Sequence, residues 1–209
     1  MKKALRLLLV EDSDLDAAHL LLELKRGGFD VTVTRVETRE DFETALYERK
    51  HDAIISDYHL PRFGAPEALN LYRQAGFDIP FIVVSGAVGE ETAVELMREG
   101  AHDYLLKHRL TRLAAAVERE LQQAGTRHAK QRAEDLFQGV LRASPLPGML
   151  VDRATGWVVD GSDSYRRQFL EGKAFNPERG LFDLVEFSQP ERIQQLIALG
   201  SGTAWGVVY

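Results

Sequence analysis

The chain has 209 residues, of which 44% are hydrophobic and 28% charged, a size that fits one large or two modest domains. The absence of cysteine excludes disulfides, iron–sulfur clusters, cysteine-ligated zinc and thiol catalysis, and a formal net charge of −6 provides no overall basic field for nucleic acid. Residues 1–124 carry 16 basic and 22 acidic side chains, whereas residues 125–209 carry 10 of each. This shift predicts a domain boundary near residue 125.

The amino-terminal apolar run is predicted to be a buried strand of a cytoplasmic protein. Arg6 interrupts the run, Glu11 and Asp12 follow it directly, and it lacks the small-residue cleavage site of a signal peptide. No stretch of the sequence approaches the roughly 20 apolar residues of a membrane span, so we expect no membrane association.

Strand-length apolar runs alternate with helical patterns through the first half of the chain. Several runs are unbroken, as is typical of parallel strands covered by helices on both faces. This alternation predicts a doubly wound α/β domain of about 120 residues. The expected strands are Leu7–Val10, Val31–Val36, Ala53–Ile55, Phe81–Val84 and Tyr104–Leu106, and the expected helices are Leu15–Lys25, Arg39–Lys50, a segment opened by Pro66, and Glu90–Arg98.

A long helix without proline is predicted from Leu110 to about Arg142. Its two apolar stripes are out of phase across Gly125-Thr126, which indicates either a stutter or an interruption. We interpret residues 110–142 as a helical connector that overlaps the last helix of a first domain at 1–124 and associates with a second copy. The stripes are Val117, Leu121 and Ala124, and then Ala129, Ala133, Leu136 and Val140.

Residues 143–209 are predicted to form a separate, smaller α+β segment. Pro145 and Pro147 mark its start, and a turn at Arg153–Gly156 separates two short apolar runs, which predicts a hairpin. The chain stops on an expected strand, so we expect either a truncated or an unusually short domain. The later elements are expected at Ser164–Leu170, Leu181–Phe187, Glu191–Leu199 and Thr203–Tyr209.

Reactive side chains follow four of the five expected strands, at the sheet edge where doubly wound proteins form their sites. Three crowded carboxylates favour a hard cation such as Mg²⁺, and a carboxylate can attack phosphorus to form an aspartyl phosphate. A lysine and a hydroxyl then stabilise the phosphoryl oxygens. The candidate residues are Glu11 and Asp12 after the first strand, Asp57 after the third, Ser85 after the fourth and Lys107 after the fifth.

At residues 4–122 the sequence resembles the receiver domain of bacterial response regulators. Five motifs in order carry the resemblance: Leu8-Leu9-Val10-Glu11-Asp12, Ser56-Asp57 with Leu60-Pro61, Val84-Ser85-Gly86, Gly100-Ala101-His102-Asp103-Tyr104, and Leu106-Lys107. The resemblance implies a flavodoxin-like, five-stranded parallel sheet in the order 2-1-3-4-5. The usual proline after the lysine is His108 here, a departure that affects the following loop and leaves the chemistry intact.

The resemblance also implies a role for each site residue. Asp57 accepts the phosphoryl group, and Glu11, Asp12, Asp57 and the backbone carbonyl of His59 hold Mg²⁺. Lys107 contacts the phosphoryl group, while Ser85 and Tyr104 switch position and alter the face formed by the fourth helix, fifth strand and fifth helix. The expected donor is a sensor histidine kinase or a histidine phosphotransfer protein. We expect the chain to form a homodimer and to bind no nucleic acid. We expect it to catalyse only its own phosphorylation and dephosphorylation.

Residues 143–209 resemble the start of a PAS sensory domain, through a Pro/Gly start, an Asp-centred hairpin and Leu181-Phe182-Asp183-Leu184-Val185. Without a thiol this segment cannot form a cysteinyl flavin adduct, and the last histidine, His128, precedes it. We therefore expect neither that photochemistry nor a histidine-ligated haem.

Two other functions remain open from the residues. Asp12-Ser13-Asp14 imitates the nucleophile motif of haloacid-dehalogenase phosphatases, but that reading lacks a later acidic pair and leaves Asp57 unexplained. A non-phosphorylated pseudo-receiver scaffold is the second alternative, and the complete set of acidic residues argues against it. A phosphorelay role for His128 lacks the acidic residue expected directly after it, where Ala129 stands.

Overall fold

The structure is a computed structural model that describes residues 2–48, 50–61, 63–86, 89–151 and 158–169. The chain divides into two compact units, residues 1–129 and residues 130–209, and each is described by itself. Across the described ranges, no helix combines the length and the apolar character that crossing a membrane requires.

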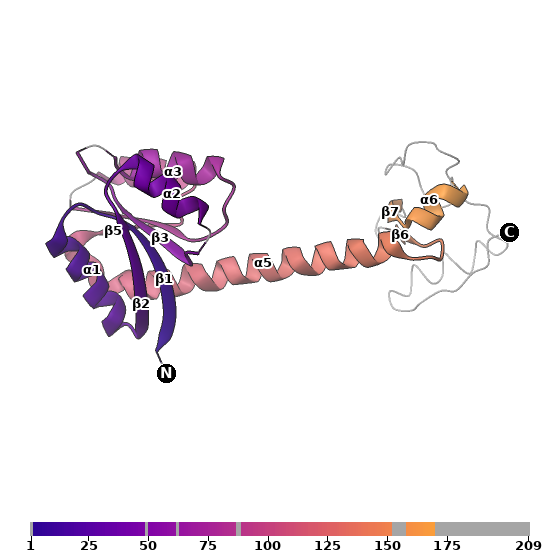
Figure 1. The fold of residues 1–209 in the computed structure, drawn as a ribbon, viewed down its shortest axis with the longest axis horizontal. Coiled ribbons are helices and arrows are strands. Elements are labelled where there is room, and N and C mark those ends of the chain that lie inside the picture. The colour runs from indigo at the N-terminus through magenta and orange to yellow at the C-terminus, as the bar shows by residue number, and fades with distance from the viewer. Residues whose placement is uncertain (1, 49, 62, 87–88, 152–157, 170–209) are drawn as a thin grey trace. The chain divides into compact units, whose positions relative to one another are not determined.

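The first unit contains a five-stranded parallel sheet in the order β2-β1-β3-β4-β5 (Figure 1). The expected sheet order is therefore confirmed. Each expected strand is present, and each extends beyond the expected apolar run, often through polar residues such as Asp57, Ser85 and Asp103. The strands are β1 Lys3–Val10, β2 Phe29–Val36, β3 Ala53–Asp57, β4 Phe81–Ser85 and β5 Asp103–Leu106.

The helices of this unit begin and end close to their sequence signals. The side chains of Ser13 and Thr38 each accept a hydrogen bond from a backbone N–H in the first turn of α1 and α2. Gly100 ends α4 at φ 110°, a left-handed conformation that favours glycine. The helices are α1 Asp14–Arg26, α2 Arg39–Tyr47, α3 Ala65–Gln74, α4 Glu90–Glu99, the 3₁₀ helix η1 Lys107–Arg112, which includes His108, and α5 Leu113–Ala143.

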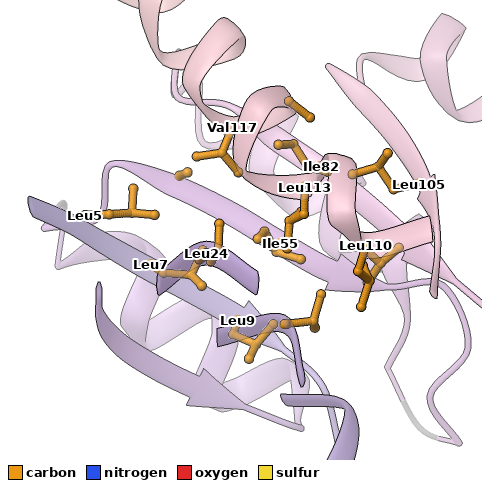
Figure 2. Packing of buried hydrophobic residues seen from close by; sticks show 14 of the residues in the cluster. Leu5, Leu7, Leu9, Leu24, Ile55, Ile82, Leu105, Leu110, Leu113 and Val117 are labelled. Atoms are coloured by element: carbon orange, nitrogen blue, oxygen red, sulfur yellow. The ribbon is translucent and has the colours of Figure 1, made fainter. Parts of the chain in front are cut away.

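Side chains that alternate along each strand divide the core into two layers. Figure 2 shows the layer in which Leu5, Leu7 and Leu9 of β1 pack with residues of α1 and α5, such as Leu24 and Val117. The opposite layer contains Leu8 and Val10 together with side chains of α2, α3 and α4. Helices thus cover both faces of the sheet, which explains the unbroken apolar runs in the sequence.

The helix α5 is continuous through Gly125-Thr126, so of the two alternatives, a stutter or an interruption, the interruption is excluded. Val117 is fully buried, Ala124 is 4% exposed, and Leu121 packs against the core of the first unit. The second stripe, with Leu136 and Val140, is exposed. The phase changes because the first stripe covers the sheet and the second does not. The first stripe, which was expected to contribute to self-association, is therefore occupied by the core of its own unit.

The described part of the second unit contains the expected hairpin. Strands β6 Met149–Val151 and β7 Val158–Gly161 pair in antiparallel fashion, and the helix α6 Asp163–Phe169 follows. The Ser162 hydroxyl caps this helix by accepting the Tyr165 N–H at 3.0 Å. The turn at 153–156, Trp157, and the elements expected at 181–187, 191–199 and 203–209 lie outside the described residues, so the PAS-like fold remains a prediction.

Candidate functional site

The register of the parallel strands brings the candidate residues to one edge of the sheet. Val10 pairs with Ser56, so Glu11 and Asp57, each one residue later, lie at the same level. Ser85 pairs with Leu106, the residue before Lys107. The sheet topology therefore collects side chains that are up to 96 residues apart in the sequence.

The three acidic residues expected to bind metal lie together. One oxygen from each of Glu11, Asp12 and Asp57 lies within 4.8 Å of the others. Glu11 is fully buried and Asp57 is 6% exposed, while Asp12 faces solvent. Burial raises the pKa of Glu11, with a smaller contribution from the charge of Asp57, while Lys107 and the Ser13 N–H oppose the rise. A set of hard, negatively charged oxygen donors with one solvent-facing side fits Mg²⁺, which retains several of its waters in proteins.

Lys107 lies among carboxylates at this edge. Its Nζ donates to Glu11 Oε2 at 2.9 Å and to Asp57 Oδ2 at 2.8 Å. A third acceptor is Asp16 Oδ2 at 2.6 Å. Burial alone would lower the pKa of Lys107, but the hydrogen bonds to Asp16, Asp57 and Glu11 outweigh it and raise that pKa well above its usual value. The lysine is therefore a fixed positive charge beside Asp57.

Asp16 is a site residue that the sequence analysis missed. It lies in the first turn of α1, where its backbone N–H donates to the Ser13 hydroxyl at 3.2 Å. Acidic residues are common in the first turn of a helix because they complement its dipole, so their type alone signals nothing more. Asp14 lies in the same turn, and nothing in the sequence distinguishes Asp16 from it as a partner of Lys107.

Ser85 and Tyr104 lie on the face of the sheet covered by α2, α3 and α4. Ser85 is 1% exposed at the end of β4, and Tyr104 packs against the core layer of that face. The Tyr104 hydroxyl is buried and, among the described residues, has no hydrogen bond of normal geometry. Burial raises the pKa of Tyr104, and the neighbouring Ser85 hydroxyl opposes the rise. The buried Tyr104 hydroxyl thus lies beside Ser85.

Two residues of the motif Asp12-Ser13-Asp14 have structural roles. Ser13 caps α1, as its hydrogen bond to Asp16 shows. The Asp14 side chain is 92% exposed and pairs with Arg35. Asp57, by contrast, is buried next to Lys107. Asp57 is thus a buried carboxylate in contact with a cation, whereas Asp12 faces solvent.

The first unit is similar to curated proteins over about half of this chain. The cell cycle transcriptional regulator CtrA of Caulobacter vibrioides is 31% identical over 103 residues, which cover 49% of this chain and 44% of CtrA. The transcriptional regulatory protein QseB of Escherichia coli O157:H7 is 34% identical over 115 residues, which cover 54% of this chain and 52% of QseB. The chain thus spans about half the length of these relatives.

Solved structures share the fold of the same region. The signal receiver domain of a protein described as a Luxo repressor from Vibrio parahaemolyticus is 28% identical, with a TM-score of 0.54, and the match covers 60% of this chain and 96% of that one. A protein described as a response regulator from Chloroflexus aurantiacus is 27% identical, with a TM-score of 0.51, over 57% of this chain and 99% of that one. The family model of the response regulator receiver domain matches residues 7–118, more than half of the chain, and the chain belongs to that family.

Proposed function

We propose that this chain accepts a phosphoryl group on Asp57 from a phosphohistidine donor, in a reaction that requires Mg²⁺. The observation that carries the proposal is the arrangement of Asp57 between two further carboxylates and the ammonium of Lys107. A buried carboxylate next to a cation and a metal-binding oxygen set has the parts that phosphoryl transfer needs.

Glu11, Asp12 and Asp57 supply the carboxylate ligands, and the carbonyl of His59 is the expected backbone ligand. Mg²⁺ held by these residues would supply neutralisation of the charge on the phosphoryl oxygens. The phosphorus–nitrogen bond of the donor breaks as a bond from an Asp57 oxygen to phosphorus forms, and the released imidazole takes a proton from solvent. Lys107 stabilises the charge on the transferred group, and we assign no other catalytic activity to the receiver unit.

The output of the reaction is a change at Ser85 and Tyr104. A phosphoryl group on Asp57 gives the buried Ser85 hydroxyl an anionic acceptor, which draws it toward the site. The Tyr104 hydroxyl lies directly behind it and has no fixed partner of its own among the described residues. Movement of these two side chains would alter the surface formed by α4, β5 and α5.

The partner that delivers the phosphoryl group must approach the sheet edge at which α1 begins. Leu15 is 83% exposed and Leu22 is 46% exposed, seven residues apart on the same face of α1. Exposed leucines beside a reactive site are typical of a protein-binding surface. We assign this surface to a histidine kinase or a histidine phosphotransfer protein.

The second stripe of α5 is proposed to pair with a second copy of the chain. Leu136, Phe137 and Val140 are 70%, 52% and 66% exposed. With Ala129 and Ala133, Leu136 and Val140 repeat at intervals of three and four residues, the spacing of a coiled-coil seam. Self-association would give the connector a partner and would carry the state of the receiver to residues 143–209.

The proposal is tested by incubating the full chain with phosphoramidate and measuring its intact mass. We expect one added phosphoryl group, about 80 Da, only when Mg²⁺ is present. Asp57→Asn removes the acceptor and should abolish the addition, while Asp14→Asn, a carboxylate change in the neighbouring turn, should leave it intact. A phosphoryl group that persists in Asp57→Asn, or that maps to Asp12, would support the phosphatase alternative. Absence of any addition to the wild type would support the scaffold.

A further inference from the structure

The guanidinium of Arg35 contacts the loop that carries two of the proposed metal ligands. Its Nε donates to the backbone carbonyl of Glu11 at 2.7 Å, and its Nη2 donates to the carbonyl of Asp12 at 2.7 Å. The side chain also pairs with Asp14 and, at 2.8 Å, with Glu37. One planar group thus joins the end of β2 to consecutive residues after β1.

The strand register explains how Arg35 reaches this loop. Arg35 pairs with Leu9 in the parallel ladder, and the last backbone bond between the two strands runs from the Glu11 N–H to the Val36 carbonyl at 3.2 Å. Beyond this point the chain leaves the sheet to enter α1, so the carbonyls of Glu11 and Asp12 no longer face a neighbouring strand. The Arg35 donors satisfy them at that position.

We propose that Arg35 is a positioning residue for Mg²⁺: it fixes the backbone of Glu11 and Asp12 so that both carboxylates are aligned before the metal binds. The inference rests on the proposed magnesium site and assigns no contact with the metal. Groups that hold metal ligands in place contribute substantially to affinity, because they remove the need to order those ligands on binding.

The charge of Arg35 and its two carbonyl contacts have opposite effects on the affinity for Mg²⁺. A positive charge near a cation site weakens binding of the cation, so its removal by itself would strengthen binding of Mg²⁺. Loss of the two carbonyl contacts has the opposite effect. Lysine retains the charge but cannot donate along two directions from one rigid plane. The sign of the change in affinity therefore separates positioning from simple electrostatics.

The experiment is a calorimetric titration of the full chain with MgCl₂, without any phosphodonor. We expect Arg35→Gln and Arg35→Lys each to weaken binding by about tenfold, the scale found when groups that orient metal ligands are removed. Glu37→Gln removes one ion pair and leaves both carbonyl contacts. Its affinity for Mg²⁺ should stay within about twofold of wild type, because an exposed ion pair contributes little. Hydrogen exchange of the Ser13 and Asp14 amides in metal-free protein should be faster in both Arg35 variants.

Each outcome has a distinct meaning. Tighter binding in Arg35→Gln with no change in Arg35→Lys would show that Arg35 acts through its charge alone. Wild-type affinity for Mg²⁺ in both Arg35 variants, even with lower thermal stability, would show that the contacts of Arg35 stabilise the fold and do not position the metal ligands. Loss of affinity in Glu37→Gln equal to that in Arg35→Gln would assign the effect to the ion pair. If the wild-type chain does not bind Mg²⁺, the proposed function itself fails.

Discussion

The ammonium of Lys107 lies 2.6 Å from Asp16 Oδ2, a shorter contact than the 2.8 Å to Asp57 Oδ2. Asp16 is therefore part of the charge balance at the site, although its side chain is 42% exposed. It gives Lys107 a carboxylate partner that is not itself one of the proposed metal ligands. Lys107 can retain this partner when Asp57 carries a phosphoryl group.

Asp16→Asn is expected to weaken Mg²⁺ binding. The substitution removes one negative charge from the site, and it leaves Lys107 to pair more fully with Glu11 and Asp57, which then compete with the metal. Both effects have the same sign, and together they should cost about threefold to tenfold in affinity, the effect of roughly 1 kcal/mol of charge interaction near a surface. Calorimetric titration with MgCl₂ measures the change. Asp30→Asn, at an exposed position of β2, is the control, and an equal loss in both variants would show a general effect of charge.

Leu15→Ser is expected to slow phosphoryl transfer from a phosphohistidine protein while leaving transfer from phosphoramidate unchanged. Leu15 is 83% exposed in the free chain, so burying it against a partner would contribute about 1.5 kcal/mol, roughly a tenfold change in rate constant at low concentration. The readout is the rate of phosphorylation by each donor. Val94→Ser on α4, where the side chain is 50% exposed, serves as control. Equal slowing with both donors would place the defect in the site itself.

Leu136→Glu together with Val140→Glu is expected to convert a dimer to a monomer. Both residues lie on one face of α5, and two buried glutamates in a helix–helix seam would repel their counterparts and lose apolar burial. Multi-angle light scattering on the full chain measures the mass. Gln138→Glu adds charge between these positions, on the far side of the same helix, and should leave the dimer intact. A wild-type chain that is monomeric at high concentration would contradict self-association.

His102 is expected to make the stability of the receiver fall as the pH drops below about 6.5, the ordinary pKa of histidine. Its Nδ1 accepts the Phe81 N–H at 3.1 Å, which requires an unprotonated nitrogen. Burial, and then the charge of Arg127, lower the pKa of His102. The unfolded chain therefore binds the proton at higher pH than the folded chain, and stability is lost between the two pKa values.

Urea unfolding followed by far-ultraviolet circular dichroism between pH 5 and pH 8 checks this expectation. In His102→Asn the side-chain carbonyl replaces Nδ1 as acceptor without titrating, so the fall in stability should be smaller than in wild type. A residual fall is expected in the variant, because burial also lowers the pKa of His51. An identical pH dependence in both proteins would exclude His102 as the cause.

The sequence by itself determined the local elements and the side chains that follow them. Unbroken apolar runs and period-3.6 patterns report how one segment is buried, so the five strands, most helix boundaries and the hairpin of β6 and β7 could be predicted without the fold. Glu11 and Lys107 were identified because each directly follows an apolar run, and Asp57 because it follows one after a single serine. Because the carboxyl ends of parallel strands meet at one edge of the sheet, such residues are expected to lie near one another.

Only the tertiary structure decided which residues meet across the site. Asp16 and Lys107 are 91 residues apart, and Arg35 lies 24 residues from Glu11, so neither contact leaves a periodic pattern in the sequence. The same holds for α5, because the sequence shows two apolar stripes but does not show which surface each stripe packs against. Burial of Val117 against the sheet and exposure of Val140 follow from where the helix leaves the receiver core, and long-range packing alone fixes that point.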